Sequence, residues 1–184
     1  MGGVIYLIRH TSVEKMEGIC YGQSDVKLSS DFKAEAEIIR LKLSGIKFDA
    51  CYSSPLSRCS ELSSFLGFSY CRDERLKEMD FGEWELLPWT DIYDSSEGKI
   101  WFEDFLNYAT PGGESFRALV DRIAEFLNEQ IKTQKTVAIV THAGPVRAFL
   151  VALGLVRFES AFDVKTAFGE VIKIENNSYN YITL

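Results

Sequence analysis

The stretch 4-VIYLIRHTS-12 is an apolar run that ends in two side chains that a hydrophobic core rejects. Residues 4–8 are continuously apolar, which is typical of a strand covered on both faces. Arg9 and His10 follow directly. The chain holds only one other histidine, His142, and it ends a second apolar run in 136-TVAIVTHAG-144. We therefore expect two buried strands to carry polar residues to one edge of a sheet.

Helix-like and strand-like segments alternate along the rest of the chain. Apolar residues recur at helical spacing in residues 31–45 and again in residues 115–132. The full prediction has strands at 4–8, 48–54, 68–71 and 136–141, helices at 31–45, 56–67, 115–132 and 144–154, and a hairpin at 169–184 around Asn176 and Asn177. This order predicts an α/β fold, a three-layer sandwich in which helices flank a mainly parallel, mixed sheet.

The chain of 184 residues has the length of one domain, and we expect a single domain over residues 1–184. From about residue 80 to residue 113 the periodicity weakens, in a segment that holds all three tryptophans. We interpret this segment as an excursion that covers one end of the sheet and the site there. Its aromatic side chains either roof a flat ligand or pack into a satellite core, and for most of them we favour packing.

Charge and composition limit the classes of partner. A net charge of -7 argues against nucleic acids and anionic membranes as partners. No stretch reaches the roughly 20 apolar residues of a membrane helix, and the N-terminus lacks the pattern of a signal peptide. The cysteines stand at positions 20, 51, 59 and 71, which matches no zinc motif. We predict reduced thiols in a cytoplasmic protein with no metal and no cofactor.

Four basic or imidazole side chains are predicted to meet in one crevice. Ligands of open α/β sheets bind beyond the carboxyl ends of the strands. Arg9, His10 and His142 lie at such ends, and Arg58 follows the strand at 48–54. Guanidinium groups match phosphate oxygens, and a neutral histidine can act as a nucleophile toward phosphorus. The alternatives are a chance Arg-His pair in a loop and a core histidine bonded to the backbone.

Five motifs follow one another along essentially the whole chain. They are 7-LIRHT-11, 52-YSSPLSRC-59, 75-RLKEMDFGEWE-85, 111-PGGESF-116 and 140-VTHAGPVRAFL-150. Together they resemble the histidine phosphatase superfamily, the phosphoglycerate-mutase-like proteins, in which Arg-His-Gly follows the first strand. The resemblance implies a phosphoglycerate mutase-like fold and phosphoryl transfer through a phosphohistidine.

The resemblance also assigns roles to five residues. His10 resembles the phosphorylated nucleophile, and Arg9 and Arg58 resemble the residues that grip the phosphate. His142 resembles the second histidine, which hydrogen-bonds the transferring group. Glu78 matches the acid that protonates the leaving oxygen and then activates water, although composition alone would leave it a surface carboxylate.

Within the superfamily, 9-RHTSVEKMEGICYGQSDVKLS-29 is most similar to the alpha-ribazole phosphatases of cobalamin biosynthesis. Thr11 replaces the common glycine and fits this subgroup. Met16 stands where the family has an asparagine, so one phosphate contact is either missing or supplied by Gln23 or Ser24. The predicted substrate-binding residues are Arg9, Arg58, Tyr21, Gly22, Gln23 and Ser24.

The leading prediction is a phosphomonoester hydrolase that dephosphorylates alpha-ribazole 5'-phosphate. One alternative is a broad-specificity phosphatase of sugar phosphates or nucleotides, and another is a phosphoglycerate mutase-like enzyme. A third, from another class, is an inactive phosphate-binding module. The expected partner is a small phosphomonoester, and the sequence leaves the oligomeric state open.

Overall fold

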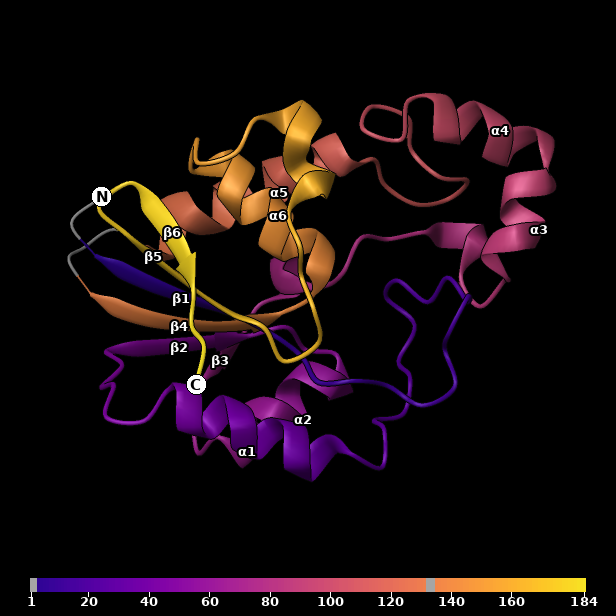
Figure 1. Cartoon of the computed structure of the whole chain (residues 1–184). Coiled ribbons are helices and arrows are strands. Elements are labelled where there is room, and N and C mark those ends of the chain that lie inside the picture. The colour runs from indigo at the N-terminus through magenta and orange to yellow at the C-terminus, as the bar shows by residue number, and fades with distance from the viewer. Residues whose placement is uncertain (1–2, 132–134) are drawn as a thin grey trace.

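The computed structural model describes residues 3–131 and 135–184 and has an α/β architecture (Figure 1). In this part of the chain one sheet has the strand order β3-β2-β4-β1-β5-β6. The strands are β1 (Val4–Arg9), β2 (Ala50–Ser53), β3 (Cys71–Arg72), β4 (Thr136–Thr141), β5 (Val171–Glu175) and β6 (Ser178–Tyr181). The α-helices are α1 (Phe32–Lys42), α2 (Ser57–Phe65), α3 (Trp89–Asp94), α4 (Ser96–Glu103), α5 (Phe116–Gln130) and α6 (Ala143–Ala152).

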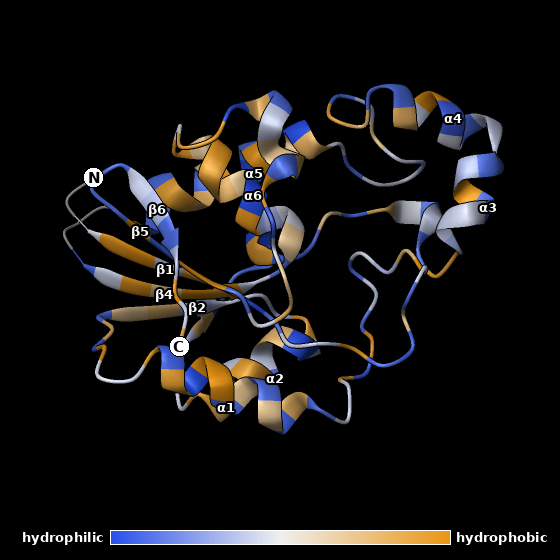
Figure 2. Cartoon of the chain, in the orientation of Figure 1, coloured by the Kyte–Doolittle hydropathy of each residue, from blue (hydrophilic) through white to orange (hydrophobic). Residues whose placement is uncertain are grey.

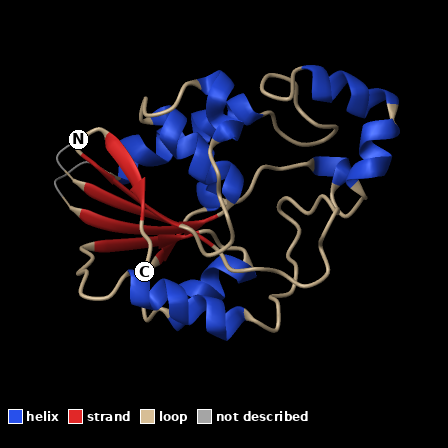
Figure 3. Cartoon of the chain, viewed as in Figure 1, coloured by secondary structure: helices blue, strands red, loops and turns tan. Residues whose placement is uncertain are grey.

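The helices cover both faces of the sheet. Figure 3 shows the strands as one twisted layer, with α1 and α2 on one face and α5 and α6 on the other (labels in Figure 1). Strands β1, β2, β3 and β4 pair in parallel, and β5 and β6 add antiparallel strands beside β1. The predicted three-layer sandwich with a mainly parallel, mixed sheet is confirmed.

Strand register brings the ends of three strands to the same edge of the sheet. Arg9 of β1 pairs with Thr141 of β4, so His10 and His142 both leave the sheet at this level. The His10 amide donates to the Thr141 carbonyl at 3.0 Å. Ser53, the last residue of β2, pairs with Val140 on the other side of β4. Parallel pairing therefore concentrates the polar residues that follow these strands.

Side chains of β1 alternate between two cores, which explains its unbroken apolar run. Ile5 and Leu7 pack with the residues of α5 and α6, including Phe126. Tyr6 and Ile8 pack on the opposite face with those of α1 and α2. Figure 2 shows the resulting apolar colouring along the central strands and on the helix faces turned to them. A strand buried on both faces needs no polar position until it reaches Arg9.

The C-terminal hairpin forms as predicted, because Asn176 and Asn177 supply its turn. Both residues have positive φ, 51° and 58°, which suits a two-residue turn between antiparallel strands. The strand expected at 68–71 is wrong in its position: only Cys71–Arg72 pair with β2. The Phe68 ring packs instead on Phe48, at 5.4 Å between centroids. The predicted helix at 115–132 ends at Gln130, and Lys132 lies outside the described residues.

The excursion at 80–113 contains α3, α4 and an aromatic cluster. The Trp84 and Trp101 rings lie 5.5 Å apart and both are buried, so packing is the role of these two. The centroids of the Trp89 and Phe81 rings lie 5.3 Å apart. Figure 1 places α3 and α4 away from the sheet, beyond the loop that follows β1. A bridge between Ile19 and Pro88 joins that loop to the excursion.

Candidate active site

His10 is held as a tautomer with a free Nε2 lone pair. Its Nδ1 lies 2.7 Å from the Thr11 carbonyl oxygen. A carbonyl oxygen only accepts, so Nδ1 carries the proton and donates it in this contact. A neutral imidazole with its proton on Nδ1 has an unprotonated Nε2. The Thr11 carbonyl therefore selects the tautomer in which the His10 Nε2 has the lone pair that a nucleophile needs.

His142 has the opposite tautomer. The Arg58 Nε donates to its Nδ1 at 3.1 Å, because a guanidinium cannot accept. Nε2 therefore carries the proton and donates to the Ser54 Oγ at 2.8 Å. The His10 and His142 rings lie 5.0 Å apart. Both nitrogens of His142 are occupied, and only Nε2 carries a proton, so the predicted hydrogen bond to a transferring group requires Nε2 to leave Ser54.

Burial and neighbouring positive charge keep both imidazoles neutral. Burial is the largest cause that lowers the pKa of His10 and of His142 well below the usual 6.5, and the Arg58 guanidinium lowers both further. His10 is 1% exposed and His142 is fully buried. A neutral imidazole keeps the lone pair that a nucleophile needs.

Arg58 is fully buried at the start of α2 and binds only neutral acceptors. Its Nη1 donates to the Ser24 carbonyl at 2.9 Å and its Nη2 to the Gly22 carbonyl at 2.6 Å. Within the described residues no carboxylate lies within 4 Å of its guanidinium. A buried cation without a counter-ion favours the binding of an anion.

Arg9 adds a second cation at the end of β1. Its Nη1 donates to the Thr166 carbonyl, and its Cζ lies 3.9 Å from the centroid of the Phe168 ring. Its Nε is buried and has no hydrogen-bond partner in the described structure. Burial lowers the pKa of Arg9, which means that its charge is poorly solvated. An anion placed between Arg9 and Arg58 would compensate both charges.

Glu78 reaches the same site from the segment between β3 and the excursion. Its Oε1 accepts from the Gly144 amide at 3.0 Å and from the Met79 amide at 2.9 Å. Gly144 lies in the first turn of α6, so the amide that holds the Glu78 side chain is one that the helix itself leaves without a partner. A Cβ on Gly144 would lie 2.2 Å from Glu78 Oε1, so a larger residue there would displace the carboxyl group from this position. This role of Gly144 was missed, because no local signal in the sequence links it to Glu78.

The loop after β1 is anchored by Glu85, a residue that the sequence analysis missed. The Glu85 carboxylate accepts from the backbone N–H of Gln23 at 2.7 Å and from the backbone N–H of Ser24 at 2.6 Å. It also accepts from the Ser24 hydroxyl. The Gln23 Nε2 donates to the Glu78 carbonyl at 3.2 Å. A Cβ on Gly22 would lie 2.3 Å from Glu85. In this structure the donors of Gln23 and Ser24 hold the loop in place rather than facing the pocket.

A pocket of about 520 Å³ opens beside these residues. Its lining includes Arg9, Tyr21, Gly22, Phe81, Glu78, Trp89, Arg147 and Lys165. Neither Met16 nor His10 is part of the lining, and the centroid of the His10 ring lies 5.0 Å from that of His142 and 5.5 Å from that of Phe168. The structure therefore brings the five predicted catalytic residues together at one end of the sheet, with Arg9 and Glu78 facing the pocket.

Within residues 3–131 and 135–184, no group of three or more His, Cys, Asp or Glu side chains is arranged to hold a metal ion. No helix in these ranges combines the length and apolar character that a membrane crossing requires.

Residues 5–182 match the sequence model of the histidine phosphatase superfamily (branch 1). Phosphoserine phosphatase 1 of Hydrogenobacter thermophilus is 29% identical over 158 residues, which cover 81% of this chain and 75% of that protein. The 2,3-bisphosphoglycerate-dependent phosphoglycerate mutase of Brucella canis is 29% identical over 170 residues, 83% of this chain and 82% of that one. The chain therefore belongs to the histidine phosphatase superfamily and is a phosphatase.

Solved structures share the fold over nearly the whole chain. The alpha-ribazole phosphatase of Shigella flexneri superposes with a TM-score of 0.83 at 22% identity, covering 97% of this chain and 94% of that one. A mycobacterial glucosyl-3-phosphoglycerate phosphatase gives a TM-score of 0.84 at 20% identity, covering 97% and 96%. At such low identity these superpositions establish the fold, and the substrate stays open.

The depressed histidine pKa values predict a stability loss in mild acid. Below the ordinary pKa of 6.5 the unfolded chain binds protons that the folded chain does not, so the free energy of unfolding falls as pH falls. Between pH 6.5 and pH 5 we expect a slope approaching about 1.4 kcal/mol per pH unit for each histidine. Urea unfolding across this range measures it.

The His10→Gln variant serves as the control and should lose about half of that slope. A wild-type stability that stays level from pH 6.5 to pH 5 would mean that the two imidazoles are protonated in the folded protein as readily as in the unfolded chain.

Proposed function

We propose that this phosphatase hydrolyses phosphomonoesters through a phosphohistidine at His10. The observation that carries the proposal is the free Nε2 of a neutral His10, held near the fully buried guanidinium of Arg58 and the half-buried Arg9, neither of which forms an ion pair with a carboxylate of the described residues. The Nε2 lone pair forms a bond to phosphorus while the bond from phosphorus to the leaving oxygen breaks. Arg9 and Arg58 balance the negative charge of the phosphoryl group through this step.

Glu78 is the proposed acid and base. Its protonated carboxyl gives its proton to the leaving oxygen, and the resulting carboxylate takes a proton from the water that attacks the phosphohistidine. The nitrogen–phosphorus bond then breaks, its electron pair returns to Nε2, and inorganic phosphate leaves. His142 donates a hydrogen bond to the phosphoryl group once it turns from Ser54. We also propose that Gln23 or Ser24 contacts the phosphate when the loop opens.

For the substrate we propose alpha-ribazole 5'-phosphate. The resemblance of the loop after β1 to the alpha-ribazole phosphatases supports it, as does the aromatic lining of the pocket. Tyr21, Phe81 and Trp89 offer flat surfaces on which a base can stack. We further propose that the excursion at 80–113, as part of a single domain, forms one wall of the site. The four free cysteines support a cytoplasmic location.

A second candidate is a small phosphomonoester that carries a carboxylate. Arg147 lines the pocket, and its buried Nε has no partner in the described structure. Lys165 lines the same pocket. Arg147 and Lys165 are additional to Arg9 and Arg58, which are assigned to the phosphate. Their positive charges suit a second anionic group on the substrate. The phosphoserine phosphatase and the phosphoglycerate mutase among the relatives are named for substrates of this kind.

The covalent mechanism predicts that label from a ³²P-phosphomonoester appears on His10. In wild-type protein quenched during turnover we expect acid-labile, base-stable label, and mass spectrometry of the peptides should place it on His10. His10→Ala should abolish turnover and retain the wild-type circular dichroism spectrum. Cys71→Ser, which changes an exposed thiol, should label like the wild type. Label on serine or cysteine would rule out the mechanism.

Two variants separate the proposed substrates. Stacking contributes about 1 to 3 kcal/mol per base, so Tyr21→Ala should lower kcat/KM for alpha-ribazole 5'-phosphate by roughly ten- to a hundredfold and leave p-nitrophenyl phosphate within about threefold. Arg147→Met should leave alpha-ribazole 5'-phosphate little changed. A wild-type preference for 3-phosphoglycerate or phosphoserine, lost in Arg147→Met, would instead establish the second candidate.

A further inference from the structure

We infer that Arg122, paired with Glu114, is a positioning residue that fixes the backbone of Glu78. The inference rests on the proposed acid role of Glu78, and it concerns a pair of residues from outside the pocket. Arg122 lies on α5, and Glu114 lies in the turn that precedes this helix. Neither residue lines the pocket described above.

The segment 75–80 carries Glu78 and has no strand partner of its own. It runs from the 3-10 helix Glu74–Leu76 toward the 3-10 helix Gly82–Trp84. Its peptide groups therefore depend on side chains and loops for their hydrogen bonds. A catalytic carboxyl on such a segment is placed well only if something holds the segment.

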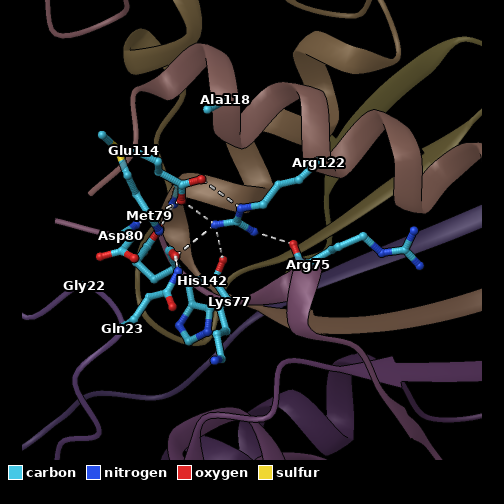
Figure 4. A network of polar contacts seen from close by, with 12 residues as sticks. Gly22, Gln23, Arg75, Lys77, Met79, Asp80, Glu114, Ala118, Arg122 and His142 are labelled. Atoms are coloured by element: carbon cyan, nitrogen blue, oxygen red, sulfur yellow. Dashed lines mark hydrogen bonds and ion pairs between the residues drawn. The ribbon is translucent and has the colours of Figure 1, made fainter. Parts of the chain in front are cut away.

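Arg122 supplies three of these hydrogen bonds. Its Nη2 donates to the carbonyls of Lys77 and Glu78, each at 2.9 Å, and its Nη1 donates to the carbonyl of Arg75. Figure 4 shows the guanidinium pointing into this segment, while the Arg75 side chain extends away from it. One planar guanidinium thus binds the carbonyls of both peptide groups that flank the Glu78 Cα.

Glu114 orients the guanidinium and extends the contact. Its Oε2 accepts from the Arg122 Nε at 3.0 Å and its Oε1 from the Nη2 at 2.7 Å, in a two-point pair. The same Oε1 accepts from the Asp80 amide at 2.9 Å, and the Glu114 amide donates to the Asp80 carbonyl at 2.9 Å. The pair is 17% and 16% exposed, so water competes little with these bonds.

Other contacts hold the segment, but none replaces Arg122 at Glu78. The Thr141 hydroxyl donates to the Leu76 carbonyl at 2.7 Å. The Gln23 Nε2 reaches the Glu78 carbonyl at 3.2 Å, a longer bond from a loop. Lysine at position 122 could keep the charge but could not make the two-point pair and bind separate carbonyls with one rigid group.

The test compares leaving groups, because a general acid matters most for a poor one. The kcat/KM covers the steps up to cleavage of the ester, so it excludes hydrolysis of the phosphohistidine. We expect Arg122→Lys to lower kcat/KM for ribose 5-phosphate at least about tenfold and to leave p-nitrophenyl phosphate within about threefold. Glu114→Gln should show the same selectivity, and it guards against a folding defect in the first variant.

Arg75→Lys is the matched control. Arg75 pairs with Asp73 at similar burial, 21% and 16% exposed, and belongs to the same segment, but its side chain does not reach Glu78. We expect this variant to change neither substrate by more than about twofold. Equal losses on both substrates in Arg122→Lys, or the same selectivity in Arg75→Lys, would overturn the positioning role in favour of a structural one.

A double variant separates this inference from the proposed function. If Arg122 acts through Glu78, Arg122→Lys should add almost nothing on ribose 5-phosphate once Glu78→Gln is present. Additive losses overturn the positioning role alone. If Glu78→Gln itself lacks selectivity for poor leaving groups, the acid role of Glu78 falls, and the inference about Arg122 falls with it.

Discussion

The arrangement of the site depends on one buried cation, Arg58, whose hydrogen-bond partners among residues 3–131 and 135–184 are all neutral. Its three donor nitrogens bind the carbonyls of Gly22 and Ser24 and the Nδ1 of His142. It therefore fixes the loop after β1 and selects the tautomer of the second histidine. Its charge also lowers the pKa of both imidazoles. A carboxylate partner would cancel this field, and its absence leaves the charge available for an anion.

The sheet makes this arrangement possible by its register. Because β1 and β4 are paired in parallel and in line, the two histidines leave the sheet together, and β2 brings Arg58 in from the other side. Glu78 lies on an irregular segment. Backbone amides hold its carboxylate, and Arg122 of α5 binds its carbonyl. The chain thus places its cations on regular elements and its proposed proton-transfer group on a segment that other side chains hold.

Local patterns predicted the parts of the structure that depend on neighbours in sequence. The apolar runs before Arg9 and His142 predicted buried strands. Because ligands of open α/β sheets bind beyond the carboxyl ends of the strands, these residues were predicted to lie together. Glu78 came only from the family resemblance, since nothing near it marks a catalytic carboxyl. Glu85 escaped notice because its partners lie about sixty residues away, at Gln23 and Ser24. The strand predicted at 68–71 is wrong in its position. Phe68 packs on Phe48, a residue outside its own segment, and a local sequence pattern does not show that contact.

The proposed mechanism requires His10 to be a neutral nucleophile with its proton on Nδ1. Two-bond ¹⁵N–¹H correlation spectra of histidine-labelled protein at pH 7, assigned with His10→Gln, measure this directly. We expect a protonated Nδ1 and an unprotonated Nε2 on His10, with the reverse pattern on His142. A His10 ring protonated on both nitrogens, or on Nε2 alone, would contradict it.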